Sequence, residues 1–185
     1  MAHAPLLVVV MGPSGCGKST LAAEMAKKTN AVFVEGDDHH PPANKAKMKA
    51  GEPLSDTDRT DWLDDLTAAI RSAEAPLVWL ACSALTPYVQ RRLREETERA
   101  VRFVLLEVPK EVLCERMIKR SDHYMPASLL DSQLSALDVP EDAIRLRADM
   151  PLSRLNQHLL EALTSDPLPL GLGEQADQHR HDKTH

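Results

Sequence analysis

Aromatic residues are scarce, making up only 3% of the 185 residues. Aliphatic side chains must therefore fill the core, and a hydrophobic share of 43% is enough to build one. A chain of this length fits one domain, because single cores stop growing only beyond about 250 residues. We therefore expect a single domain with one core.

Cysteines are also few, and Cys16, Cys82 and Cys114 form no C-x-x-C pair. Their spacing argues against a zinc site or a redox dithiol and favours a reducing compartment. No apolar stretch approaches the roughly 18–20 residues of a membrane helix, and the first residues lack the basic run of a signal peptide. We therefore expect a cytoplasmic protein without a membrane partner.

Positive charge is in deficit as well, since the formal net charge is −6. This is the wrong sign for a protein whose main partner is a nucleic acid, so we expect none. A small anionic ligand can still bind where basic groups converge locally.

Short apolar runs alternate with longer amphipathic segments, a pattern typical of βαβ units and a parallel sheet covered by helices. The apolar runs predict strands at Leu6–Met11, Ala31–Glu35, Leu77–Ala81, Val101–Glu107 and Ile144–Asp149. The amphipathic segments predict helices at Lys18–Thr29, Asp56–Ser72, Thr86–Glu98, Lys110–Lys119 and Leu152–Leu163. We expect residues 1–165 to form the domain and the polar residues 166–185 to be a disordered tail.

The segment from Gly12 to Ser19 reads G-P-S-G-C-G-K-S and matches the phosphate-loop pattern G-x-x-x-x-G-K-[ST] between a strand and a helix. Such a loop turns backbone N–H groups toward phosphates, and the following helix adds its positive dipole end. Lys18 should reach the β- and γ-phosphates, and Ser19 should bind Mg²⁺. ATP and Mg²⁺ are thus the expected ligands. The expected nucleotide contacts are Gly12, Ser14, Gly15, Cys16, Gly17, Lys18, Ser19 and Thr20.

Two further features bear on this loop. The guanine motif N/T-K-x-D is unsupported, because the nearest candidate, residues 44–47, lacks the aspartate. Cys16 lies among N–H groups beside Lys18, a setting that favours thiolate. We expect its alkylation to inactivate the protein and MgATP to protect it; the alternative is a buried, inert thiol.

Residues 36–63 follow the pattern G-D-x-x-H-P-x-x-N-x-x-K-M-x-x-G-x-P-L-x-D-x-D-R-x-x-W-L, and in every fixed position this stretch resembles gluconokinases. The match continues through residues 82–85, 120–125, 129–130 and 132–133. The resemblance implies a P-loop NTPase fold of the α/β class, with a five-stranded parallel sheet in the order 2-3-1-4-5 and a lid. It also implies a homodimer that uses ATP to phosphorylate D-gluconate to 6-phospho-D-gluconate, feeding the pentose phosphate pathway.

Asp37 comes just after the second predicted strand, at the edge where ligands bind in open α/β sheets. It could orient or deprotonate an acceptor hydroxyl, or merely cap a helix. His40 and Arg59 offer donors to a polyhydroxy acid, and Arg59 suits its carboxylate, although a solvated arginine is the alternative. The resemblance adds Ser83 and His123 to the acceptor site and places Glu35 with Ser19 at the metal.

Arg116 and Arg120 are four residues apart, so both can face a transferring phosphate from one helix side. We expect both to be catalytic and residues 120–128 to form the lid; Arg116 could instead pair with Glu111 or Glu115. Two other functions stay open: a kinase of this architecture that phosphorylates shikimate or a nucleoside monophosphate, and a nucleotide-binding regulator without catalysis.

Overall fold

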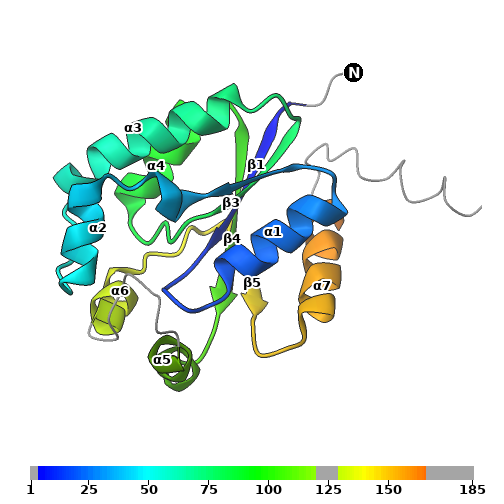
Figure 1. Ribbon diagram of the computed structural model, residues 1–185. Helices are drawn as coiled ribbons and strands as arrows, with labels where there is room; N and C mark the ends of the chain where they lie inside the picture. Colours follow the sequence, from blue (N-terminus) through cyan, green and yellow to red (C-terminus); the bar gives the residue numbers. More distant parts are fainter. Residues whose placement is uncertain (1–3, 120–128, 166–185) are drawn as a thin grey trace, which may run out of the picture.

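Five parallel strands form the centre of the protein in the order β2-β3-β1-β4-β5 (Figure 1). The computed structural model describes residues 4–119 and 129–165. The strands are β1 (Leu6–Met11), β2 (Val32–Glu35), β3 (Leu77–Ala81), β4 (Ala100–Glu107) and β5 (Ile144–Arg147). The strand order that the resemblance implies is therefore confirmed. The fifth strand is two residues shorter than predicted, and it pairs only with β4.

Helices cover both faces of this sheet (Figure 1). On one face lie α1 (Lys18–Lys28) and α7 (Leu152–Ser165), and on the other lie α3 (Asp56–Ser72) and α4 (Pro87–Glu96). The central strand β1 is buried along its whole length, and its side chains alternate between the two layers, as the two-residue period of a strand requires. Val8 packs on the α1 side, and Val9 packs on the α3 side.

The remaining short elements gather at the edge where the strands end (Figure 1). They are the 3₁₀ turn η1 (Gly36–His39), α2 (Pro42–Lys49), α5 (Lys110–Lys119) and α6 (Leu130–Ala136). The helices α2 and α6 lie outside the predicted set, and the stretch between β2 and α3 is more regular than expected. A capping box at Ser55, whose hydroxyl oxygen accepts a hydrogen bond from the backbone N–H of Asp58, begins α3 and so ends this stretch.

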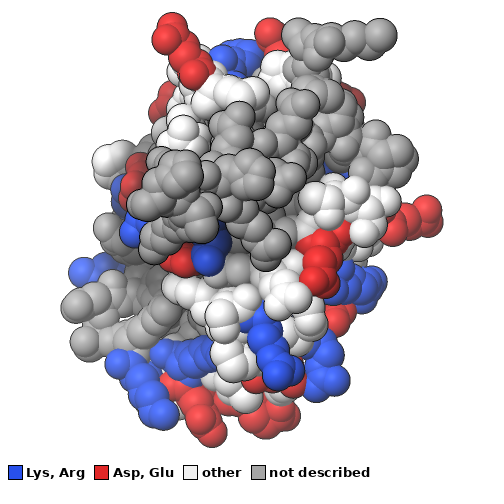
Figure 2. All heavy atoms as spheres, turned by 90° about the vertical axis from the view of Figure 1, so that its right-hand side faces the viewer, with Lys and Arg blue, Asp and Glu red and all other residues white. Residues whose placement is uncertain are grey.

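Basic and acidic side chains lie interspersed on the described part of the face that carries α1 and α7 (Figure 2). Among the described helices, no stretch combines the length and apolar character needed to cross a membrane.

Candidate functional site

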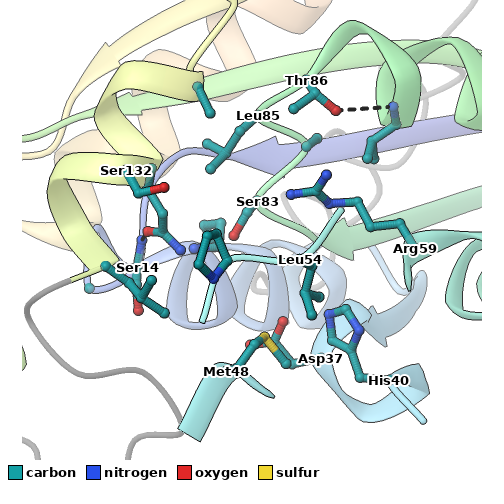
Figure 3. A pocket seen from close by; sticks show the side chains of 18 of the residues that line it. Ser14, Asp37, His40, Met48, Leu54, Arg59, Ser83, Leu85, Thr86 and Ser132 are labelled. Carbon is teal, nitrogen blue, oxygen red and sulfur yellow. Dashed lines mark hydrogen bonds between the residues drawn. The ribbon is translucent and has the colours of Figure 1, made fainter. Parts of the chain in front are cut away.

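A pocket of about 150 Å³ opens at the carboxyl ends of the strands (Figure 3). The phosphate-loop segment and the start of α1 form one wall, and residues 36–63 form another. The loop after β3 and the helix α6 close the remaining sides. Six of the predicted loop residues line this pocket, namely Ser14, Gly15, Gly17, Lys18, Ser19 and Thr20.

The loop has the backbone geometry that its glycines were expected to allow. Gly15 has φ +83°, and a Cβ there would lie 3.3 Å from Met117 Cγ of α5, so α5 packs directly on the loop. Gly17, at φ +104°, is the N-cap of α1. Lys18 Nζ donates a hydrogen bond to the carbonyl oxygen of Pro13 at 3.0 Å, which holds the ammonium group over the loop.

Gly12 and Cys16 lie behind the pocket wall. The N–H of Gly12 donates to Ser83 O at 3.2 Å, which joins the loop to the end of β3. The Cys16 side chain is only 2% exposed and belongs to the core on the α1 side. This burial favours the alternative of a buried, inert thiol, while inactivation by alkylation and protection by MgATP stay predictions.

Glu35, at the end of β2, is paired with Ser19 at the start of α1. Burial raises the pKa of the Glu35 carboxyl, while the neighbouring Ser19 hydroxyl and the Lys18 ammonium group oppose this shift. Among the described residues, no three His, Cys, Asp or Glu side chains gather as a metal cage. One hydroxyl and one carboxylate nevertheless suit Mg²⁺, which takes its other ligands from phosphates and water.

The turn η1 is held tightly against the sheet. A Cβ on Gly36 would lie 2.7 Å from the carbonyl oxygen of Ala81, so only glycine fits at this close approach. The Gly36 carbonyl accepts a 2.8 Å hydrogen bond from Trp62 Nε1 of α3. This anchorage fixes the turn that carries Asp37 and His40 into the pocket (Figure 3).

His40 is a buried side chain with defined neighbours. Its ring stacks on Trp62 with the centroids 4.4 Å apart and the planes 16° apart. Burial lowers the His40 pKa to about 4, although the nearby Asp37 carboxylate opposes the shift. The imidazole is therefore neutral near pH 7. Trp62 itself is 5% exposed, so it packs in the core as expected while forming part of the pocket lining.

Arg59 reaches the pocket from the first turn of α3. Its Nη1 forms an ion pair with Asp56 Oδ1 at 2.9 Å, and its side chain is 22% exposed. In Figure 3 the guanidinium group points toward the middle of the pocket, in the direction of Ser83. Arg59 is thus partly sheltered and oriented, rather than a fully solvated surface arginine.

The other predicted residues are distributed as follows. Ser83 lines the pocket on the loop after β3. Arg116 donates to the carbonyl oxygen of Gly15 at 3.4 Å, so it contacts the phosphate loop from α5. Arg120 and His123 lie outside the described residues, as does the predicted lid at 120–128.

The pocket also contains residues to which the sequence assigned no role. Gln133 of α6 accepts a 2.8 Å hydrogen bond at Oε1 from the backbone N–H of Ser14 in the phosphate loop. Met48 of α2 and Leu54 line the acceptor side. All three belong to stretches that matched the family pattern, but matching alone did not indicate that they meet in one pocket.

Comparisons with known proteins agree with this arrangement. A family model described as an AAA domain matches residues 7–140. A gluconokinase from Gluconobacter oxydans is 42% identical over 142 residues, covering 75% of this chain and 78% of that protein. The crystal structure of a gluconokinase from Sinorhizobium meliloti has a TM-score of 0.77 at 37% identity and covers 89% and 94% of the two chains. The shikimate kinase of Aquifex aeolicus, at 16% identity and a TM-score of 0.58, shares the fold alone.

Proposed function

Since this chain belongs to the gluconokinase family, we propose that it transfers the γ-phosphoryl group of ATP to D-gluconate, forming 6-phospho-D-gluconate and ADP. One observation carries the proposal: the phosphate loop and the acceptor residues Asp37, His40 and Arg59 line the same pocket. A transferring phosphoryl group must touch both substrates, so their binding groups have to face each other across one cavity.

The nucleotide side of the pocket supplies charge stabilisation. Lys18 would bind the β- and γ-phosphates, and the N–H groups from Gly15 to Thr20 would cradle them at the start of α1. Arg116 would support the loop through Gly15 O. Mg²⁺, held by Ser19 and Glu35, would neutralise charge on the phosphates when bound.

The acceptor side supplies recognition and a proton acceptor. Arg59 would pair with the gluconate carboxylate, and His40 and Ser83 would bind hydroxyl groups. The hydroxyl that attacks the γ-phosphorus would lose its proton to the Asp37 carboxylate as the new P–O bond forms and the bond to ADP breaks.

The test measures ADP release with D-gluconate, glucose, shikimate and nucleoside monophosphates as acceptors. D-gluconate should be the best acceptor, and neutral glucose should be poor because it cannot pair with Arg59. Glucose turned over as efficiently as gluconate would remove that role from Arg59. A preference for shikimate or a nucleotide would refute the proposed function.

Two variants separate chemistry from nucleotide binding. Asp37→Asn should lower kcat by about 10²-fold or more while leaving ATP affinity nearly unchanged, because it removes only the proton acceptor. Lys18→Ala should weaken ATP binding as well as turnover. Asp38→Asn is the matched control, since Asp38 is exposed on the same turn and does not line the pocket. Near-normal turnover of Asp37→Asn would exclude the proposed proton transfer.

Several finer expectations remain predictions. A homodimer can be tested by sedimentation, and a cytoplasmic location by fractionation. The lid at 120–128, with catalytic Arg120 and acceptor-binding His123, should exchange amide hydrogens more slowly once an ATP analogue and gluconate are both bound. Unchanged exchange there would remove the lid from the mechanism.

A further inference from the structure

The inner edge of His40 faces Asn44, one helical turn further along the chain. Asn44 Nδ2 lies 3.5 Å from His40 Nδ1, and the Asn44 side chain belongs to a residue that is only 3% exposed. Both residues are buried beneath the acceptor side of the pocket. The contact therefore bears on the state of a ring that lines the site.

The orientation of the Asn44 amide is set by a second contact. Asn44 Nδ2 donates to the backbone carbonyl oxygen of Asp58 at 2.7 Å. A carbonyl oxygen can only accept, so the amide nitrogen, not the amide oxygen, has to occupy this position. The same nitrogen carries the second hydrogen that faces His40 Nδ1.

This arrangement decides the tautomer of His40. Because an amide NH₂ group only donates, Nδ1 has to accept, and two N–H groups facing each other there would repel. The ring proton therefore lies on Nε2, at the opposite side of the imidazole. The stack on Trp62 and the bond from Trp62 to Gly36 O keep the ring plane in place.

The charged groups around His40 do not change this state near pH 7. Asp37 favours the imidazolium form, whereas Lys45, Arg59 and the adjacent His39 disfavour it. Burial outweighs each of these effects, so His40 stays neutral. A neutral ring with a single N–H has one donor and one acceptor, and Asn44 already uses the acceptor.

We propose that Asn44 is a positioning residue that holds His40 in the Nε2–H tautomer, so that the ring presents a neutral hydrogen-bond donor to the acceptor substrate. The role in substrate binding rests on the proposed function, whereas the tautomer itself does not. The Nε2–H group favours acceptors that place a hydroxyl or carboxylate oxygen opposite it, as a sugar acid can, and it disfavours ligands that place an N–H donor there.

The tautomer can be measured directly on the full chain without any substrate. Long-range ¹H–¹⁵N spectra of histidine-labelled protein distinguish Nδ1–H from Nε2–H, and the His40 signals among the eight histidines are assigned by their loss in His40→Gln. We expect Nε2–H in the wild type at pH 7. Asn44→Asp, which turns the donor into an acceptor, should place a proton on Nδ1. Asn30→Asp makes the same chemical change at an exposed turn and should leave the His40 signals unchanged.

Kinetics then test the role, using the acceptor that the panel above identifies. Asn44→Asp should raise the KM for the acceptor about tenfold, because one hydrogen bond to the acceptor is lost, and it should leave ATP affinity unchanged. In a His40→Gln background, where no imidazole tautomer remains to be fixed, Asn44→Asp should raise the acceptor KM much less. The same loss in both backgrounds would mean that Asn44 only supports the fold. An Nδ1–H wild type, or an unchanged acceptor KM in Asn44→Asp, would overturn the proposal, while a different preferred acceptor would refute only the proposed function.

Discussion

Acidification should destabilise this protein through His40. The folded-state pKa of His40 is lowered from 6.5 to about 4 by burial. Between these values the unfolded chain binds a proton that the folded protein excludes, so the free energy of unfolding falls as the pH falls. The full shift corresponds to about 3 kcal/mol, of which about 2 kcal/mol should already be lost at pH 5.

The assay is urea unfolding followed by circular dichroism at pH 7, 6 and 5, with His40→Gln as the matched variant. The difference between the two proteins isolates His40, because other groups titrate in both. Glu35 opposes this loss of stability, because its raised pKa lets the folded state take up a proton before the unfolded chain does. The pKa of Asp58 is lowered to about 2, so its contribution to the free energy of unfolding is lost only below pH 3.8. Parallel loss of stability in wild type and variant between pH 7 and pH 5 would refute the reasoning.

Three further changes test other parts of the site. Gly36→Ala should unseat the η1 turn, because its Cβ would meet the Ala81 carbonyl at 2.7 Å, and it should lower both melting temperature and kcat; a fully active variant would show that the turn can shift freely. Gln133→Glu keeps an acceptor for the Ser14 N–H but adds a negative charge beside the phosphate loop, so ATP binding measured by calorimetry should weaken roughly tenfold. An unchanged ATP affinity would mean that the phosphates bind elsewhere. Ser55→Ala removes half of the capping box of α3 and should cost about 1 kcal/mol in urea unfolding without altering the acceptor KM, and a loss near zero would mean that the cap is not used.

The central strands and the phosphate loop could be predicted from local sequence patterns. The run Leu6–Met11 is apolar throughout because β1 is covered on both faces, and the loop after it carries a motif whose spacing is set by phosphate geometry. The place of Asp37 at the edge of the sheet also followed from local pattern, since it comes just past a predicted strand end. These features depend on neighbours in sequence.

The missed features depend on distant contacts or weak periodicity. The helix α2 buries only Asn44 and Met48, so it has almost no apolar stripe to detect, and α6 has only seven residues. The bond between Gln133 and Ser14 joins residues 119 positions apart. The burial of the Cys16 side chain was left open for a different reason, because a motif specifies the backbone of the loop and does not fix the direction of each side chain.

The acceptor side of the pocket is formed mainly by one continuous segment, residues 36–63, which is stabilised by contacts between its own residues. Trp62 holds the first residue of the stretch, Asn44 holds the backbone of Asp58, and Lys47 forms a 2.6 Å ion pair with the same aspartate. Most contacts that stabilise residues 36–63 are made within this segment, so the segment can change in evolution as a unit. Grafting residues 36–63 between related kinases should therefore carry acceptor choice with it, while the nucleotide end of the pocket stays as it is.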